Sequence, residues 1–252
     1  MSAPKVIGVI PSRFAATRLP GKPLLDLCGK PLIQWVYERA RECKRIDELY
    51  VATDDERIAQ AVKKAGGQAI LTDSALASGT DRVAAVARQM EGDVFVNIQG
   101  DEPLINPQAI DKAIEWVTSK QCEMATLRVP IRSTEELHNA AVVKVIQDRL
   151  GRAIYFSRYP IPYSRQTEPF SGESFASGRH VGLYVYSRET LFRLQSLHPS
   201  TLEKGESLEQ LRALQDGISI GVVESDFISI GVDTPEELEK AREILNRIIG
   251  KV

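Results

Sequence analysis

The sequence predicts an α/β fold in which a mostly parallel β-sheet is flanked by helices. The first observation is that short β-branched runs alternate with helix-length amphipathic segments through the first half of the chain. This β-α-β-α order is typical of parallel sheets that are covered on both faces. The second observation is an ordinary globular composition, with 43% hydrophobic and 26% charged residues among 252, which excludes a disordered or coiled-coil chain.

Strand and helix segments alternate in the first half of the chain. The predicted strands are β-branched runs bounded by polar or turn residues, namely Lys5–Ile10, Glu48–Thr53, Gln68–Thr72 and Asp93–Ile98. The predicted helices carry apolar residues at helical spacing and occupy Pro31–Lys44, Asp55–Ala65, Gly79–Met90 and Pro107–Ser119. With right-handed crossovers these units build one sheet, and its ligands are expected at the carboxyl ends of the strands.

The second half is richer in strands and includes a predicted β-hairpin. Val142–Gln147 and Arg152–Ser157 are strand-like and are separated by a short turn that contains Gly151. The stretch Arg158–Gly178 has no clear period and is predicted to leave the sheet. The other predicted elements are strands Met124–Val129, His180–Tyr186 and Ile218–Val223, helices Leu191–Leu197 and Leu208–Gln215, and a last helix with Leu238, Ala241, Leu245, Ile248 and Ile249 on one face. We expect a single domain over 1–252, in which residues 130–190 form a smaller β-rich subregion.

Charge, hydropathy and cysteine content limit the partners and the location of the chain. The 32 Lys and Arg against 34 Asp and Glu leave a net charge of −2, so no attraction to nucleic acid or an anionic membrane is predicted. No apolar run reaches the roughly 18 residues of a membrane helix, and the first apolar stretch ends at Pro11, which is too short for a signal peptide. We therefore expect a cytoplasmic protein. Cys28, Cys43 and Cys122 form no C-x-x-C pair and are predicted to be reduced thiols.

A cationic loop follows the first predicted strand. Arg13, Arg18 and Lys22 fall within ten positions of a segment that also contains Pro20 and Gly21. At the carboxyl end of a strand, such cations are placed to make charge-assisted hydrogen bonds to a polyphosphate. The spacing matches neither the Walker A nor the G-x-G-x-x-G motif. The alternative is a solvated surface turn, but the position at the ligand-binding edge favours anion binding.

Two acidic segments follow other predicted strands. Asp101 and Glu102 come directly after an apolar strand, where a carboxylate can hold Mg²⁺ against phosphate oxygens. A strand-terminating turn explains these residues equally well. Asp233 precedes a Thr-Pro-Glu-Glu helix start with a capping box. Because helix capping accounts for every residue of this segment except Asp233, the residues alone favour a structural interpretation.

Together these segments make the chain resemble the sugar-nucleotide cytidylyltransferases, and among them the branch that activates 3-deoxy-D-manno-octulosonate (Kdo). The resemblance extends over essentially the whole chain. It rests on an ordered set of motifs: Arg13 to Pro23, Ser78 to Arg82, Gln99 to Pro103, Tyr155 to Arg158, Arg179 to Tyr184, Leu208 to Arg212, and Gly231 to Pro235. The first motif alone indicates only a nucleotidyltransferase, whereas the ordered set is specific to the Kdo branch.

The resemblance implies a Rossmann-like nucleotidyltransferase fold, a smaller β-rich insertion for substrate and dimer contacts, and a role for each motif. It implies that the catalytic residues are Lys22, Arg13, Asp101 and Asp233. It implies that CTP is bound by Arg13, Lys22, Ser78, Gly79, Arg82, Gln99 and Asp101, and Mg²⁺ by Asp101 and Asp233. It implies that Kdo is bound by Arg158, His180, Tyr184, Glu209 and Gln210. Core packing remains the alternative for His180 and Tyr184, and an ordinary helix face for Glu209 and Gln210.

The implied reaction transfers CMP from CTP to Kdo and activates Kdo for lipopolysaccharide synthesis. The anomeric hydroxyl of Kdo attacks the α-phosphorus of CTP in line, giving CMP-Kdo and pyrophosphate. Catalysis is expected to be Mg²⁺-dependent positioning and charge neutralisation. A homodimer through the region near Val142–Ser157 is also implied. The alternatives are a cytidylyltransferase for another acid sugar such as sialic acid, or a non-catalytic nucleotide-binding regulator, which would have no reason to keep both acidic positions.

Overall fold

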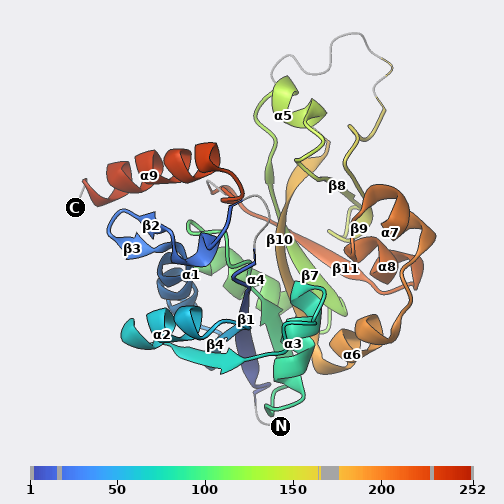
Figure 1. The fold of residues 1–252 in the computed structure, drawn as a ribbon. Helices are drawn as coiled ribbons and strands as arrows, with labels where there is room; N and C mark the ends of the chain where they lie inside the picture. The colour runs from blue at the N-terminus through green and yellow to red at the C-terminus, as the bar shows by residue number, and fades with distance from the viewer. Residues whose placement is uncertain (1–2, 16–18, 164, 166–175, 228–229, 251–252) are drawn as a thin grey trace. The chain divides into compact units, whose positions relative to one another are not determined.

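The computed structural model describes residues 3–15, 19–163, 165, 176–227 and 230–250. The chain forms two compact units, which are described separately: the first unit is Met1–Asp111 with Ile228–Val252, and the second unit is Lys112–Phe227. The predicted α/β architecture is confirmed, because strands and helices alternate along the chain (Figure 1). The expectation of one domain with a subregion at 130–190 stays a prediction.

The first unit contains a parallel sheet. Its strands are β1 (Val6–Ser12), β4 (Glu48–Thr53), β5 (Gln68–Leu71) and β6 (Val94–Asn97), in the spatial order β6-β1-β4-β5. β1, β4 and β6 are buried along nearly their whole length. Burial of both faces explains why these strands read as continuous apolar runs in the sequence.

Helices cover both faces of this sheet. α1 (Leu32–Arg41) leads from β1 to β4 and α2 (Glu56–Lys64) leads from β4 to β5, so the chain moves in one direction across the sheet. α3 (Gly79–Ala87) then leads back to β6, on the other side of β1. With right-handed crossovers, this reversal places α3 on the face opposite to α1 and α2. The carboxyl ends of β1 and β6 are therefore the switch point, where α/β sheets bind ligands.

Shorter elements and the C-terminal helix complete the first unit. After β1 the chain forms the 3-10 helix η1 (Lys22–Leu24) and a ribbon of β2 (Asp26–Leu27) and β3 (Lys30–Pro31). α9 (Pro235–Ile249) lies beside this ribbon (Figure 1), and Arg242 donates a hydrogen bond to the Asp26 carbonyl at 2.7 Å. α4 (Pro107–Thr118) follows β6, and the boundary between the two units falls within it.

The second unit contains a mixed sheet. β7 (Met124–Pro130) pairs antiparallel with β10 (Gly178–Ser187) and parallel with β11 (Ile220–Glu224). The predicted hairpin is confirmed, since β8 (Lys144–Gln147) and β9 (Ala153–Ser157) are antiparallel neighbours. Besides the end of α4, the helices described in this unit are α5 (Thr134–His138), α6 (Arg188–Ser196), α7 (Thr201–Glu206) and α8 (Gln210–Gln215). α5 and α7 were not predicted, and α8 begins two residues later than predicted.

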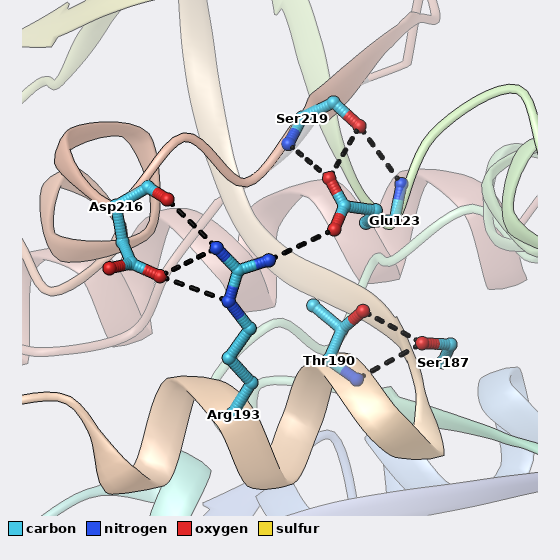
Figure 2. A network of polar contacts seen from close by, with 6 residues as sticks. All are labelled: Glu123, Ser187, Thr190, Arg193, Asp216 and Ser219. Carbon is cyan, nitrogen blue, oxygen red and sulfur yellow. Dashed lines mark hydrogen bonds and ion pairs between the residues drawn. The ribbon is translucent and has the colours of Figure 1, made fainter.

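A polar network holds α6 against the turns that precede β7 and β11 (Figure 2). Arg193 donates to the Asp216 carboxylate at 3.0 Å and to the Asp216 carbonyl at 2.8 Å, and it also contacts the Glu123 carboxylate at 3.3 Å. Glu123 accepts from the backbone N–H of Ser219 at 2.9 Å and from its hydroxyl at 3.1 Å. Ser187 caps α6 by accepting from the Thr190 N–H at 3.1 Å. The network contains none of the predicted site residues, and its hydrogen bonds join α6 to the two turns.

The three cysteines are free thiols, as predicted. Cys43 and Cys122 are buried, and burial raises the pKa of the Cys122 thiol to about 11. This thiol therefore stays protonated and unreactive at neutral pH. Among the described residues, no helix combines the length and the apolar character needed to cross a membrane.

Candidate active site

A cleft of about 390 Å³ opens at the carboxyl ends of β1 and β6 in the first unit. It is lined by Pro11, Ser12, Arg13, Leu19, Lys22, Pro23, Leu76, Ala77, Ser78, Gly79, Arg82, Gln99, Gly100, Asp101 and Asp233. The cationic loop, both acidic segments and the start of α3 therefore share one cleft. Its place at the switch point of the sheet is the usual position of a ligand site in this class of fold.

Lys22 lies between two carboxylates of the cleft. Its Nζ is 2.7 Å from Asp101 Oδ2 and 2.8 Å from Asp233 Oδ1, and 14% of its side chain is exposed. Burial lowers the pKa of Lys22, but the two carboxylates outweigh this effect, so that the pKa is raised above its ordinary value. The ammonium is therefore charged at neutral pH. The alternative of a solvated surface turn is wrong for Lys22, whereas Arg13 is exposed.

The end of the cationic loop is shaped by Gly21. This residue has a φ of 66°, in the left-handed region that favours glycine. A Cβ at Gly21 would lie 3.3 Å from the ring of Phe14, and the guanidinium of Arg57 stacks over that ring at 3.6 Å from its centroid. This packing fixes the start of η1, where Lys22 is the first residue. Arg18 lies outside the described residues, so its predicted role in anion binding stays a prediction.

Asp101 is held by the turn that follows β6. A Cβ at Gly100 would lie 2.8 Å from the Pro11 carbonyl oxygen, so this close approach to β1 requires glycine. The Asp101 carbonyl accepts a hydrogen bond from the Val232 N–H at 2.9 Å. This bond ties the segment before α9 to the end of β6. Backbone contacts thus bring Asp101 and Asp233 to the same side of the cleft.

The predicted capping box of α9 is present, and it positions Asp233. Thr234 Oγ1 accepts from the Glu237 N–H at 3.3 Å. The Glu237 carboxylate accepts from the backbone N–H groups of Thr234 at 3.0 Å and of Asp233 at 2.7 Å. The cap therefore uses the backbone of Asp233 and leaves its carboxylate for Lys22. The structural and the functional interpretations of this segment are compatible.

The Asp101 and Asp233 carboxylates form a donor pair for a hard cation. Among the described residues, no group of three or more His, Cys, Asp or Glu side chains could hold a metal ion. Mg²⁺ is commonly bound by one or two carboxylates together with the phosphates of a substrate. The pair therefore fits Mg²⁺ on the condition that a polyphosphate supplies the other oxygens.

The start of α3 contributes Ser78, Gly79 and Arg82 to the cleft. Ser78 is the N-cap of α3, and its Oγ accepts from the Asp81 N–H at 3.1 Å. Arg82 is 3% exposed. Its guanidinium donates to the Asp54 carboxylate at 2.8 Å and to the hydroxyl of a threonine at 2.7 Å. Ser78 and Arg82 therefore have structural partners in addition to lining the cleft.

The structure adds two residues to this region for which the sequence analysis assigned no role. Ser12, the last residue of β1, is 5% exposed, and its Oγ has no hydrogen-bond partner within the described part of the chain. A buried hydroxyl without a partner indicates a site for water or a ligand. Asp54 directly follows β4 and accepts from Arg82 and from the Phe14 N–H at 3.4 Å. Both follow or end a buried strand, which is the signal that points to them in the sequence.

The residues predicted to bind the acid sugar all lie in the second unit. The rings of His180 and Tyr184 on β10 have centroids 5.5 Å apart, and Phe156 of β9 meets His180 edge-on at 5.0 Å. Burial lowers the pKa of His180 to about 3 and raises the pKa of Tyr184 well above its ordinary value. Both side chains are therefore uncharged at neutral pH.

Arg158 is bound to main-chain carbonyl groups. Its guanidinium donates to the carbonyl oxygens of Glu206 at 2.8 Å, Ala140 at 3.1 Å and Ser207 at 3.4 Å. The Glu206 carboxylate in turn accepts from the Arg158 N–H at 2.8 Å and from the Ser157 hydroxyl at 2.6 Å. These bonds fasten the end of β9 to the end of α7. The three bonds from the guanidinium use three of its five N–H donors. The role predicted for Arg158 in acid-sugar binding stays a prediction.

Glu209 is the N-cap of α8, and Gln210 is the first residue of this helix. Gln210 is 5% exposed, and its Nε2 has no hydrogen-bond partner among the residues that the structure describes. Burial is the largest cause of the raised pKa of Tyr184, followed by Tyr186 and then by the negative charge of Glu209. A buried amide nitrogen without a partner indicates a place for a polar ligand or water. The roles predicted for both residues in sugar binding stay predictions.

Comparisons with known proteins place the chain in a family. A family model described as "Cytidylyltransferase" matches residues 7–220. The 3-deoxy-manno-octulosonate cytidylyltransferase of Pelobacter propionicus is 49% identical over 253 residues, which cover 98% of this chain and 99% of that protein. The enzyme of the same name from Geobacter metallireducens is 47% identical over 250 residues, with coverage of 96% and 98%. The structure of CMP:2-keto-3-deoxy-manno-octonic acid synthetase complexed with CTP is 42% identical in sequence and has a TM-score of 0.89. The match covers 96% of this chain and 99% of that chain. The chain therefore belongs to the 3-deoxy-manno-octulosonate cytidylyltransferases.

Proposed function

We propose that the chain transfers CMP from CTP to Kdo, giving CMP-Kdo and pyrophosphate. The observation that carries the proposal is the cleft of the first unit, in which the largely enclosed Lys22 ammonium is paired with the Asp101 and Asp233 carboxylates. Membership of the family supports the reaction, and the relative of 42% identity in complex with CTP supports the nucleotide.

In the proposed reaction, the anomeric hydroxyl of Kdo attacks the α-phosphorus of CTP while pyrophosphate leaves. Arg13 and Lys22 supply positive charge to the triphosphate and stabilise the negative charge that develops on the leaving pyrophosphate. The cytidine is assigned to Ser78, Gly79, Arg82 and Gln99, all of which line the same cleft. In this proposal the rate enhancement comes from positioning and charge neutralisation, and none of the described residues that line the cleft is assigned the role of a general base.

Mg²⁺ is part of this proposal. Asp101 and Asp233 would hold the ion together with phosphate oxygens of CTP, and the bound ion supplies Lewis-acid polarisation of the α-phosphate. Lys22 offsets the mutual repulsion of these two carboxylates, because its ammonium contacts both of them.

The acid sugar is assigned to five residues of the second unit, namely Arg158, His180, Tyr184, Glu209 and Gln210. Kdo carries one carboxylate and several hydroxyls, which need a cation and uncharged hydrogen-bonding groups. Arg158 supplies the cation. The pKa shifts that keep His180 and Tyr184 uncharged, and the buried amide nitrogen of Gln210 that has no partner among the described residues, support binding of hydroxyls.

Release of pyrophosphate tests the proposed function. The rate is measured with CTP and Mg²⁺ in the presence of Kdo, sialic acid or no acceptor, and then with ATP or GTP in place of CTP. We expect release only when CTP, Mg²⁺ and Kdo are all present. Equal release with sialic acid would contradict the choice of Kdo, and equal release with ATP or GTP would contradict the assigned cytidine site. No release with any acceptor would favour the non-catalytic nucleotide-binding regulator.

We also propose that the chain acts in the cytoplasm as a homodimer that forms through the hairpin near Val142–Ser157. The three free thiols support a reducing compartment. On the hairpin, Leu150 and Ile154 are 68% and 56% exposed, and exposed apolar side chains of this size support an interface between subunits. Analytical ultracentrifugation of the native chain and of Ile154→Glu tests the dimer, which we expect the substitution to weaken.

A further inference from the structure

Thr126 is a buried residue of β7 that contacts His180. It is 0% exposed. Its Oγ1 lies 2.7 Å from the Leu183 carbonyl oxygen, 3.2 Å from the Val181 carbonyl oxygen and 2.9 Å from His180 Nε2. The two carbonyls belong to an irregular stretch of β10, where the register with β7 shifts between Val181 and Tyr184. All of these groups lie in the second unit.

The number of protons available decides the direction of these hydrogen bonds. A threonine hydroxyl carries one proton and two acceptor lone pairs. Carbonyl oxygens can only accept, so the proton of Thr126 is directed at the Leu183 carbonyl, which is the nearer of the two. The contact at 2.9 Å between Thr126 Oγ1 and His180 Nε2 is then a bond in which Nε2 donates its hydrogen to Oγ1.

The state of the His180 ring follows from this bond. Burial lowers the pKa of His180 to about 3, so the ring is neutral at neutral pH and carries a single proton. With that proton on Nε2, Nδ1 is an acceptor. The groups packed around the ring include the aromatic rings of Phe156 and Tyr184. Within the described part of the chain, no hydrogen bond to Nδ1 is found.

We propose that Thr126 is a positioning residue that fixes the Nε2–H tautomer of His180, so that His180 offers Nδ1 as a hydrogen-bond acceptor to a hydroxyl of the acid sugar. The identity of the ligand rests on the proposed function, whereas the tautomer does not. An acceptor nitrogen selects a hydroxyl, because a carboxylate can only accept hydrogen bonds. His180 therefore contributes to the choice of sugar by recognising a hydroxyl, and the carboxylate of the sugar is held by another group.

NMR spectroscopy of the ring nitrogens of His180 tests the tautomer directly. Two-bond ¹H–¹⁵N spectra of the ¹⁵N-histidine-labelled chain show which ring nitrogen carries the proton. The chain contains three histidines, and His180→Gln identifies the signals of His180 by their loss. We expect a single Nε2–H tautomer that does not change across about pH 6–8, and we expect Thr126→Ser to keep it. A wild-type ring protonated on Nδ1, or on both nitrogens, at neutral pH would overturn the inference.

Substrate kinetics test the consequence for the sugar. Thr126→Val keeps the shape of the side chain and removes the hydroxyl, so the ring loses the acceptor that selects its tautomer. We expect the KM for Kdo to rise about tenfold, which corresponds to the loss of about one hydrogen bond, while the KM for CTP stays unchanged. Thr126→Ser is the matched control and should restore the KM for Kdo to near the wild-type value.

The possible outcomes distinguish this inference from the proposed function. Equal changes in both KM values, or no rescue by serine, would show that Thr126 acts only in packing and would overturn the inference. If Thr126→Val does not fold, as judged by thermal unfolding, the spectrum of the wild-type chain and the kinetics of Thr126→Ser decide. Absence of pyrophosphate release from the wild-type chain with Kdo would refute the proposed function, while the spectrum would still test the tautomer.

Discussion

Asp233→Asn separates the two roles that the segment before α9 can have. The substitution keeps the size of the side chain and removes the charge of one of the two carboxylates that contact Lys22. The capping box should persist, because it uses the backbone N–H of Asp233 and not its carboxylate. Stability and turnover are therefore expected to respond very differently to this one change.

The expected loss of stability is small and the expected loss of turnover is large. The Asp233 side chain is 38% exposed, and Lys22 keeps its contact with Asp101 at 2.7 Å. Exposed ion pairs contribute about 0.2–1 kcal/mol, and a change of about 1 kcal/mol lowers the melting temperature of a chain of this size by about 2–4 °C. Loss of an anionic group at the proposed metal site should instead lower turnover at least about 100-fold.

The assay combines initial rates of pyrophosphate release with thermal unfolding of the same preparations. Thr234→Ala is the matched control, because it removes the hydroxyl that caps α9. It should lower the free energy of unfolding by about 1 kcal/mol, while turnover stays within about threefold of wild type. A stable Asp233→Asn enzyme with a near-normal, Mg²⁺-dependent rate would refute the reasoning and leave this segment as a helix start alone.

Three further substitutions test other parts of the structure. Lys22→Ala should lower the rate of pyrophosphate release at least about 100-fold. A fully active variant would show that the contacts of Lys22 with the two carboxylates are only structural. Arg82→Met should lower the free energy of unfolding, measured in denaturant, by about 3–5 kcal/mol, because it leaves the 13% exposed Asp54 carboxylate without its partner. A loss below about 1 kcal/mol would contradict the claim that Arg82 and Asp54 form a stabilising buried ion pair. Arg193→Ala removes the centre of the network in Figure 2 and should lower stability by about 1 kcal/mol with kcat/KM unchanged; a large change in kcat/KM would contradict a purely structural role.

Long periodic elements could be predicted from the sequence, whereas short ones could not. β4 has the predicted bounds, and α1 to α4 lie within the predicted helices. η1, β2, β3, α5 and α7 contain two to six residues, which is too few for a period to be recognised. The signal that was available for α5 and α7 is capping, since each begins after a serine whose side chain accepts from the first turn.

The place of the cleft could be predicted, but its internal contacts could not. Following the strands to their carboxyl ends predicts that Arg13, Lys22 and Asp101 lie at one edge of the sheet. Nothing in the sequence indicates that only 14% of the Lys22 side chain is exposed, or that its partners lie 79 and 211 positions away. The capping of α9 is a local pattern and is visible in the sequence, whereas the contact made by the preceding Asp233 carboxylate depends on the tertiary fold.

In the second unit, the sequence indicated residue types but not their partners. The resemblance assigned Arg158 to the acid sugar, yet the three carbonyl groups that it contacts are supplied by segments distant in the sequence. Thr126 sits in an apolar strand and carries no motif. Its contact with His180 exists because the register of β10 shifts opposite to it, and such irregularities are set by tertiary packing.

A double-mutant cycle of Asp101→Asn and Asp233→Asn tests most directly the claim that both carboxylates serve one catalytic centre. kcat/KM for CTP is measured for the wild type, both single variants and the double variant, at saturating Kdo and Mg²⁺. We expect each single substitution to cost at least about 100-fold, and the double variant to be no more than about tenfold below either one, because the second change disables a centre that is already disabled. Losses that multiply to about 10⁴-fold would show two independent sites and contradict the account.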